Sequence, residues 1–314
     1  MNRSGKLVAV VAALAVTLAA CGDDDDDTSA GGSDGTEAPA REGPEISIGA
    51  QDFGESAILA NIYAGALEAD GFEASVQELG GFRDILFSSF ESGDINLAPD
   101  YVASNLEFLN DFAGEATNDV DETLDKLQPL LEEKGLTALT PSDAVDTNAF
   151  VVTSDTAEAN DLASLSDLAD NGADLTLGAP QDCETNGFCI PGLKRVYDVD
   201  LSANFVPLEF GLIPDALEAG EIDIAVVGST DGRIESNGWV LLEDDQNMLA
   251  ADNVFPLASQ ELEDAYGDDL STTLDGVSSE LTSDELIELN KRYDVDHEDA
   301  DAIAADWLEE HGLD

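Results

Sequence analysis

The feature that most constrains the fold is a short corner that occurs twice, 127 positions apart. The two copies are ESGDINLA (91–98) and EAGEIDIA (218–225). Glycine is the residue that most often ends a helix, so each copy predicts a helix that stops and turns into an apolar strand. Duplication of a lobe and independent use of a common turn both explain the pair. Either origin predicts two lobes built from strands and helices.

The rest of the chain continues the alternation of strand-like and helical patterns. About 270 residues follow position 44, which exceeds what one hydrophobic core usually serves, so two lobes are expected. Predicted strands occupy 46–50, 74–79, 95–98, 175–178, 205–208 and 222–227, and predicted helices occupy about 56–70, 83–91, 191–197 and 215–218. This alternation predicts doubly wound α/β lobes with largely parallel sheets.

Two apolar stretches, 147–153 and 253–258, are the predicted crossings between the lobes. A helical tail then returns to the first lobe. The predicted organisation is lobe I from 45–147 plus 254–314, and lobe II from 148–253. Two hinge strands permit a clamshell motion in which the lobes close around a ligand.

The N-terminus has the pattern of a secretory signal. Arg3 and Lys6 precede an apolar run, 7–20, that is too short to span a bilayer. Small residues lead to Cys21, which predicts a lipoprotein signal peptide over 1–21 and a lipidated cysteine. An uncleaved helix that ends in a chance cysteine is the alternative. Two or more acyl chains on Cys21 anchor a protein stably.

Residues 22–44 predict a disordered acidic tether. They contain five consecutive aspartates, 23–27, and have no apolar period. A solvated spacer is favoured over metal binding for such a run of like charges. A flexible segment of this length has a reach of roughly 25 to 30 Å.

The charge of the chain excludes several kinds of partner. Seventy acidic residues stand against 11 basic ones, giving a formal charge of −59. Nucleic acids and anionic membrane surfaces are therefore poor partners. The composition is that of a salt-adapted surface, and molar salt shortens the Debye length to about 3 Å, which relieves the repulsion.

Cys183 and Cys189 are close in sequence, and the protein is expected outside the reducing cytosol, so a disulfide is predicted. Two free buried thiols are the alternative. Zinc is disfavoured because the two cysteines have no suitable spacing and no histidine nearby. We expect neither a metal nor a cofactor.

Catalytic motifs are absent from the sequence, so an enzyme is not predicted. The only histidines, His297 and His311, lie in the helical tail. The acidic run 294–298 resembles a calcium-binding loop, but Asp299 replaces the required glycine and Ala305 replaces the final glutamate.

Three aromatic residues lie at predicted strand ends or crossings, where α/β folds bind ligands: Phe53, Tyr101 and Phe150. Aromatic faces attract alkylammonium cations. Packing in the core is the alternative for each residue taken alone.

Polar candidates lie in the same predicted cleft. Arg83 follows a turn at a helix start and either binds a ligand carboxylate or forms an ordinary ion pair. Thr230 and Asp231 follow a lobe II strand and are candidates for contacts that close the cleft. Capping of the next helix is the alternative role for Asp231.

Several blocks, in this order and spacing, resemble the glycine betaine/choline/carnitine-binding proteins of ABC osmoprotectant uptake systems, over 46–313. They are DFGES (52–56), LEADGF (67–72), ESGDI (91–95), PDY (99–101), PGLK (191–194), STDGR (229–233) and LEDD (242–245). The resemblance implies a periplasmic-binding-protein-like clamshell of type II. It also implies a lipid-anchored monomer on the outer face of the cell membrane, which delivers a quaternary ammonium osmolyte to ABC permease subunits.

The resemblance also assigns site residues. It places Tyr101 and Phe150 in an aromatic cage for the ammonium group, and Ser104 near the ligand carboxylate. Relatives have tyrosines near the positions of Pro214 and Ile190, so the cage is depleted here, although Phe188 lies close to Ile190 in the sequence. Another small amine or an amino acid is therefore an alternative ligand, and a module that presents its ligand to a membrane sensor is an alternative function.

Overall fold

The computed structural model describes residues 40–172 and 174–314, all of which belong to one compact unit, Glu37–Asp314. The predicted signal peptide, Cys21 and most of the predicted tether lie outside the described residues. Within the described part, no helix is long and apolar enough to cross a membrane.

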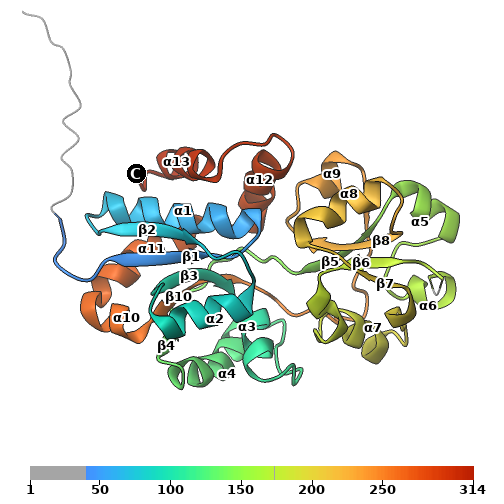
Figure 1. Ribbon diagram of the computed structural model, residues 1–314, viewed down its shortest axis with the longest axis horizontal. Coiled ribbons are helices and arrows are strands. Elements are labelled where there is room, and N and C mark those ends of the chain that lie inside the picture. The colour runs from blue at the N-terminus through green and yellow to red at the C-terminus, as the bar shows by residue number, and fades with distance from the viewer. Residues whose placement is uncertain (1–39, 173) are drawn as a thin grey trace, which may run out of the picture. The chain divides into compact units, whose positions relative to one another are not determined.

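The first sheet has the strand order β2-β1-β3-β10-β4 and carries helices on both faces (Figure 1). We call this sheet and its helices lobe I. Its strands are β1 (Ile46–Ala50), β2 (Ala74–Glu78), β3 (Leu97–Tyr101), β4 (Leu136–Ala138) and β10 (Val254–Ser259). Its helices are α1 (Gly54–Ala69), α2 (Arg83–Ser92), α3 (Val102–Leu109), α4 (Val120–Glu132), α10 (Gln260–Tyr266), α11 (Asp268–Glu280), α12 (Ser283–Asp294) and α13 (Ala300–His311). One core cluster lies under α1, α11, α12 and α13, and a second under α2, α3 and α4.

The second sheet has the order β7-β6-β8-β5-β9 and forms lobe II. Its strands are β5 (Asn148–Val152), β6 (Leu177–Ala179), β7 (Phe205–Pro207), β8 (Ile224–Gly228) and β9 (Val240–Leu241). Its helices are α5 (Ser154–Asn160), α6 (Asp167–Asn171), α7 (Ile190–Val196), α8 (Ile213–Glu218) and α9 (Arg233–Ser236), with short 3₁₀ turns η1 (Gln181–Glu184), η2 (Ser202–Asn204) and η3 (Phe210–Leu212). Two core clusters flank this sheet as well.

The α/β class is confirmed, and each sheet mixes parallel and antiparallel pairs. β1 is parallel to β2 and β3, and β6 is parallel to β7 and β8. β10 is antiparallel to both of its neighbours, and so is β5. The strands that follow the crossings between lobes are therefore the ones that run against the others, which the expectation of largely parallel sheets did not include.

The crossings lie at the start of the two segments predicted for them or just before it. Val145 pairs with Asn253 in an antiparallel bridge, and the Asp146 amide donates to the Asp252 carbonyl at 3.1 Å. The stretches 147–153 and 253–258 mostly form β5 and β10, which are buried within the sheets. Both stretches are apolar because helices cover both faces of these strands, so their apolar character does not mark a hinge. The exact lobe boundaries stay a prediction.

The repeated corner adopts one backbone conformation in both lobes. Gly93 and Gly220 have φ values of 77° and 70°. This left-handed region is costly for residues with a Cβ atom and is where helices commonly end. Gly93 ends α2, and Gly220 follows the end of α8, so each lobe turns from helix to strand in the same way.

Candidate functional site

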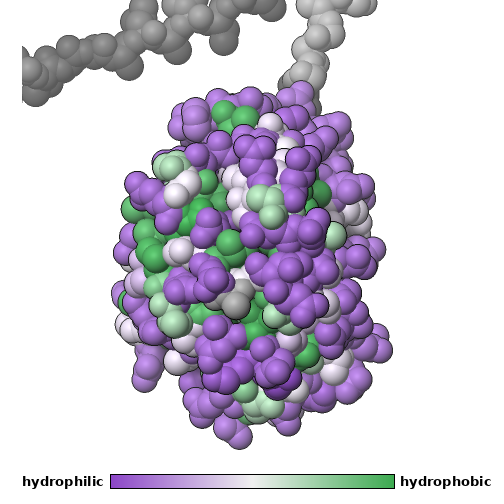
Figure 2. Space-filling view, turned by 90° about the vertical axis from the view of Figure 1, so that its right-hand side faces the viewer, coloured by the Kyte–Doolittle hydropathy of each residue, from purple (hydrophilic) through white to green (hydrophobic). Residues whose placement is uncertain are grey.

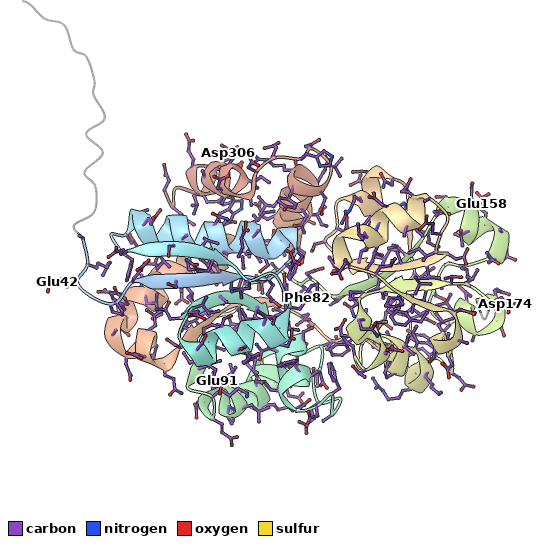
Figure 3. The ribbon with its side chains drawn as sticks, viewed as in Figure 1. Glu42, Phe82, Glu91, Glu158, Asp174 and Asp306 are labelled. Atoms are coloured by element: carbon purple, nitrogen blue, oxygen red, sulfur yellow. A yellow bond between two sulfur atoms is a disulfide. The ribbon has the colours of Figure 1, made fainter. Side chains whose placement is uncertain are left out.

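Residues from both lobes line a cleft with a volume of about 1860 Å³. It lies beyond the carboxyl ends of β1, β3, β6 and β8, which is where open α/β sheets bind ligands. Figure 3 labels Phe82, which lies in lobe I close to the junction with lobe II. The cleft is thus the candidate site.

An aromatic cluster spans the cleft. Phe53 follows β1, and its ring centroid lies 6.3 Å from those of Phe82 and Tyr101. Phe210, from η3 of lobe II, lies edge-on to Phe53 at 6.0 Å and packs against Phe82 at 6.4 Å. The predicted Phe53 and Tyr101 are therefore together in the cleft, whereas Phe82 and Phe210 were not predicted.

Tyr101 is held by a buried carboxylate. Its hydroxyl donates to Glu55 Oε1 at 2.6 Å, and its side chain is 6% exposed. Glu55 Oε2 accepts from Thr230 Oγ1 of lobe II at 2.7 Å and from Asn290 Nδ2 of α12. Burial raises the pKa of Glu55, while the three hydrogen bonds act in the opposite direction. Glu55 therefore joins the aromatic cluster to the lobe II loop.

Asp146 is a second carboxylate at this junction, and it is half-buried. It lies in the first crossing and accepts from Ser229 Oγ and the Thr230 amide, both at 3.1 Å. Burial raises the pKa of Asp146 well above its usual value, and the nearby Glu55 adds to the increase. Glu55, Asn290 and Asp146 were missed because local sequence gives no sign of which polar side chains a fold will bring together.

Arg83 lines the cleft but already has a partner. Its Nε and Nη2 atoms bind Asp100, which is fully buried and also accepts from Asn105. This is the ordinary ion pair that the sequence left open as the alternative. Breaking such a pair leaves an uncompensated buried charge, so Arg83 stays committed to Asp100.

Ser104 also lines the cleft, and it is hydrogen-bonded to Asp252 in the second crossing. Its amide donates to Asp252 at 2.9 Å, and its hydroxyl donates to the same carboxylate. Burial raises the pKa of Asp252 to about 6, although the Ser104 bonds lower it in part. The hydroxyl of Ser104 is therefore engaged with Asp252 and has no free proton to offer.

Asp231 forms an ion pair instead of a free acidic group. It binds Arg233 through two bonds of 2.8 and 2.7 Å and also accepts the Arg233 amide at 2.9 Å. The N-cap of α9 is Gly232 and has no side-chain cap bond, so Asp231 is not the capping residue that the alternative proposed. Arg233 Nη2 also lies 3.5 Å from Oδ2 of Asp294 in α12. Both arginines that line the cleft, Arg83 and Arg233, are therefore paired with carboxylates.

Phe150 does not line the main cleft, which corrects its predicted place. It is 1% exposed and packs in a lobe II core cluster with Val152. Its neighbours Ala149 and Val151 face the other cluster. Side chains alternate along β5, so Phe150 points into the lobe and borders only a separate cavity of about 280 Å³.

Gln51 is the polar residue that the sequence reasoning missed most clearly. Its side chain is 5% exposed, lines the cleft, and its Nε2 has no hydrogen-bond partner among the described residues. A buried donor left unpaired costs about 1–3 kcal/mol. A ligand acceptor would satisfy this donor.

Comparison with known proteins decides the family. The model for the substrate-binding domain of ABC-type glycine betaine transport systems, OpuAC, matches residues 44–310. The chain belongs to this family. It is therefore an extracytoplasmic substrate-binding protein of an ABC transport system.

Individual relatives agree with the family assignment. The carnitine transport binding protein OpuCC of Listeria monocytogenes is 27% identical over 270 residues, which cover 85% of this chain and 86% of that protein. The glycine betaine-binding protein YehZ of Escherichia coli is 25% identical over 284 residues, covering 87% and 93%. A solved glycine betaine/carnitine/choline ABC transporter protein is 26% identical with a TM-score of 0.68, covering 86% of this chain and 98% of that one. The type II clamshell fold is thus shown.

This OpuAC-family member supplies aromatic residues from positions other than those expected. Pro214 is buried in the first turn of α8, and Ile190 is 4% exposed in a lobe II core cluster, so neither lines the cleft. Phe210 and Phe188 line it instead. Aromatic side chains therefore line the cleft a few residues from the two positions that were predicted to lack cage tyrosines.

The structure joins Cys183 to Cys189 through a disulfide. Both cysteines line the lobe II side of the cleft. The disulfide is thus a covalent constraint placed beside the candidate site.

Within the described residues, no group of three or more histidine, cysteine or acidic side chains could hold a metal ion.

Proposed function

We propose that this protein captures a quaternary ammonium osmolyte of the glycine betaine type. The observation that carries the proposal is the aromatic cluster of Phe53, Phe82, Tyr101 and Phe210, to which both lobes contribute. Each ring face is worth about 0.5–2 kcal/mol toward a desolvated cation. A methylated ammonium group fits such a surface because it is charged but donates no hydrogen bonds.

The charge of the cleft supports the same class of ligand. Acidic side chains such as Asp52, Glu209 and Asp215 line it, whereas Arg83 and Arg233 are both neutralised by ion pairs. The lining is therefore negative on balance and attracts cations. Relatives named for glycine betaine and carnitine give independent support.

The ligand carboxylate needs a neutral donor under this proposal. Ser104 and Arg83 were the predicted contacts, but Asp252 and Asp100 already occupy them. We assign this role to Gln51, which lines the cleft and whose buried Nε2 has no hydrogen-bond partner among the described residues. Phe53 packs against Phe82 and Tyr101. Thr230 of lobe II helps to close the cleft by donating its hydroxyl hydrogen bond to Glu55 of lobe I.

The further steps of transport follow from the family. The liganded protein delivers the osmolyte to ABC permease subunits, and we propose that lipid on Cys21 anchors a monomer to the outer face of the cell membrane. Mass spectrometry of the protein extracted from the source membrane tests the anchor. A diacylated or triacylated Cys21 at the mature N-terminus is expected, and an unmodified Cys21 in an uncleaved chain would contradict it.

An analogue with a neutral head group tests the role of the cation. The ligand 3,3-dimethylbutanoate has nearly the shape of glycine betaine but lacks the positive nitrogen. Competition against bound glycine betaine should show an affinity at least about 10-fold lower for the analogue, because its tert-butyl group gains no attraction from the rings. Equal affinities would exclude recognition of the charge.

Another small amine or an amino acid is the second candidate ligand. The observation that favours it is that neither Pro214 nor Ile190 supplies a cage side chain. Competition by carnitine, choline, proline and unmethylated amines separates the two candidates, because only the methylated cations compete under the main proposal. The signalling alternative predicts no permease and ATPase genes beside this one.

A further inference from the structure

A loop of lobe I carries an aromatic residue in an unfavourable backbone conformation. Asp111 and Phe112, which follow α3, both have φ values of 57°. A bulky residue with positive φ is an outlier that persists only where its surroundings enforce it, and such residues concentrate at functional sites. Phe112 also lines the cleft.

The enforcing group is Glu107 of α3. Its carboxylate is 1% exposed and accepts the backbone amides of Gly114, Glu115 and Ala116 at 2.7, 2.6 and 2.7 Å. Its carbonyl accepts the Phe112 amide at 2.7 Å. Four bonds to one residue hold the loop in a single shape, so Phe112 is presented on a rigid support.

Phe112 reaches lobe II at Gly187. A Cβ atom built on Gly187 would lie 3.7 Å from Cβ and 3.8 Å from Cδ1 of Phe112. A methyl group at this position would therefore be in ordinary contact with Phe112, so the aromatic side chain lies next to the glycine. Gly187 is inside the loop that the Cys183–Cys189 disulfide closes. The contact therefore joins a rigid lobe I loop to a covalently closed lobe II loop.

Other contacts fix the position of this pair. The Gly187 carbonyl lies within 3.4 Å of Arg195 Nη2, and Gly192 of α7 packs closely against that carbonyl. At the base of the Phe112 loop, the Thr117 carbonyl accepts the Ala251 amide of the second crossing at 3.3 Å. The contact is thus tied both to α7 and to the hinge.

We propose that Phe112 and the disulfide-closed loop 183–189 form a latch between the lobes, in which the disulfide holds Gly187 next to Phe112 and so sets how firmly the closed cleft retains its ligand. The latch rests on the proposed ligand-binding function. Phe112 and the disulfide act here as positioning elements. Their effect on affinity comes from stabilising the closed arrangement of the lobes.

The latch makes ligand affinity sensitive to dithiols. A dithiol reductant transfers two electrons and two protons to the Sγ–Sγ bond, leaves two thiols at Cys183 and Cys189, and is itself oxidised to a disulfide. The loop then gains conformational freedom. Holding Gly187 next to Phe112 now costs entropy, so the closed state and the bound ligand are less favoured.

The first test exchanges the large and small side chains at positions 112 and 187. Calorimetric titration with glycine betaine measures Kd for each variant. Gly187→Leu should raise Kd about 10-fold because its side chain meets Phe112, and the double variant Phe112→Ala/Gly187→Leu should recover most of the loss. Phe90→Ala is the matched control, since this half-buried lobe I aromatic does not line the cleft, and its Kd should stay within about 2-fold. An unchanged Kd for Gly187→Leu, or the absence of recovery, overturns the latch.

Disulfide removal is the second test. Phe112→Ala and Cys183→Ser/Cys189→Ser should each raise Kd about 10-fold, and their combination should raise it no further, because both changes break one contact. Dithiothreitol should raise the wild-type Kd equally and leave the cysteine-free variant unaffected. If the combined variant raises Kd by the product of the two separate effects, the proposal is wrong. It is also wrong if dithiothreitol leaves the wild-type Kd unchanged although alkylation shows that both cysteines are reduced.

The proposed ligand-binding function and the latch can be disproved separately. If the oxidised wild-type protein binds no methylated ammonium ligand, the proposed function is wrong. If the wild type binds and the Phe112, Gly187 and cysteine variants bind equally well, only the latch is wrong. Thermal unfolding of each variant establishes that it is folded, and Phe112→Leu, which keeps an apolar side chain, should bind better than Phe112→Ala.

Discussion

Tyr101 combines two roles that one substitution cannot separate. Its ring lies in the aromatic cluster, and its hydroxyl is one of three donors to Glu55. The hydroxyl contributes to stability because Glu55 is buried and needs all of its donors. The ring is the part that faces the ligand under our proposal.

Two variants of Tyr101 separate these roles. Tyr101→Phe should lower the free energy of unfolding by about 1–3 kcal/mol, because a buried carboxylate loses a donor, while it keeps most of the ligand affinity. Tyr101→Ala should in addition raise the Kd for glycine betaine by more than about 10-fold. Urea unfolding and calorimetric titration measure the two effects. Wild-type affinity in Tyr101→Ala would remove Tyr101 from the site.

Gln51 is the residue for which ligand and stability effects should oppose each other. Gln51→Leu removes the unpaired Nε2 donor, so the free energy of unfolding should stay equal or rise. The Kd for glycine betaine should rise about 10-fold and that for choline less, because choline has no carboxylate to accept from Gln51. Equal effects on the two ligands would contradict the assigned contact.

At the scale of helices and strands, local signals predicted the elements but not the directions of their side chains. The glycine corners at Gly93 and Gly220 were predictable because a helix stop is a local property. The direction of the Phe150 side chain was not predictable, because β5 is buried on both faces. Its apolar residues alternate between the faces, and the sequence does not indicate which face lies nearer the cleft. Phe210 enters the cleft from a short turn, which has no periodic pattern.

Two carboxyl groups with raised pKa values, Asp252 in the second crossing and Asp294 at the end of α12, predict an unusual dependence of stability on pH. Burial raises the pKa of Asp252 and of Asp294 to about 6, above the value near 4 expected in the unfolded chain. Between these values the folded state binds more protons, so the free energy of unfolding should fall as pH rises from about 4 to about 6. For Asp252 the change is on the order of 3 kcal/mol.

Urea unfolding in molar salt between pH 4 and pH 8 measures this dependence with the exposed carboxylates screened. Asp252→Asn should flatten the slope because one of the titrating groups is gone. Stability that rises through this pH range, or an identical slope in the variant, would show that Asp252 titrates normally in the folded protein.

At the scale of the whole molecule, the charge of −59 acts against compactness. Hydrophilic residues dominate the face shown in Figure 2. Ion pairs such as Arg41–Asp269 and Lys194–Asp200 are exposed and contribute little on their own. Repulsion among the remaining carboxylates is therefore the main electrostatic effect that salt can change.

Added salt should raise the melting temperature. Molar potassium chloride shortens the Debye length to about 3 Å and screens the repulsion that opposes folding. Differential scanning calorimetry from dilute buffer to molar salt measures the change. A melting temperature that stays flat or falls with salt would mean that the acidic surface does not destabilise the fold.

The central claim is that the cleft between the lobes binds a quaternary ammonium osmolyte. Calorimetric titration of the purified protein with glycine betaine in molar salt tests it most directly. The account predicts saturable binding of one ligand per chain, displaced by choline or carnitine. The absence of both heat and thermal stabilisation with all three ligands would contradict the claim, and it would leave the OpuAC-family fold with a different small molecule in its cleft.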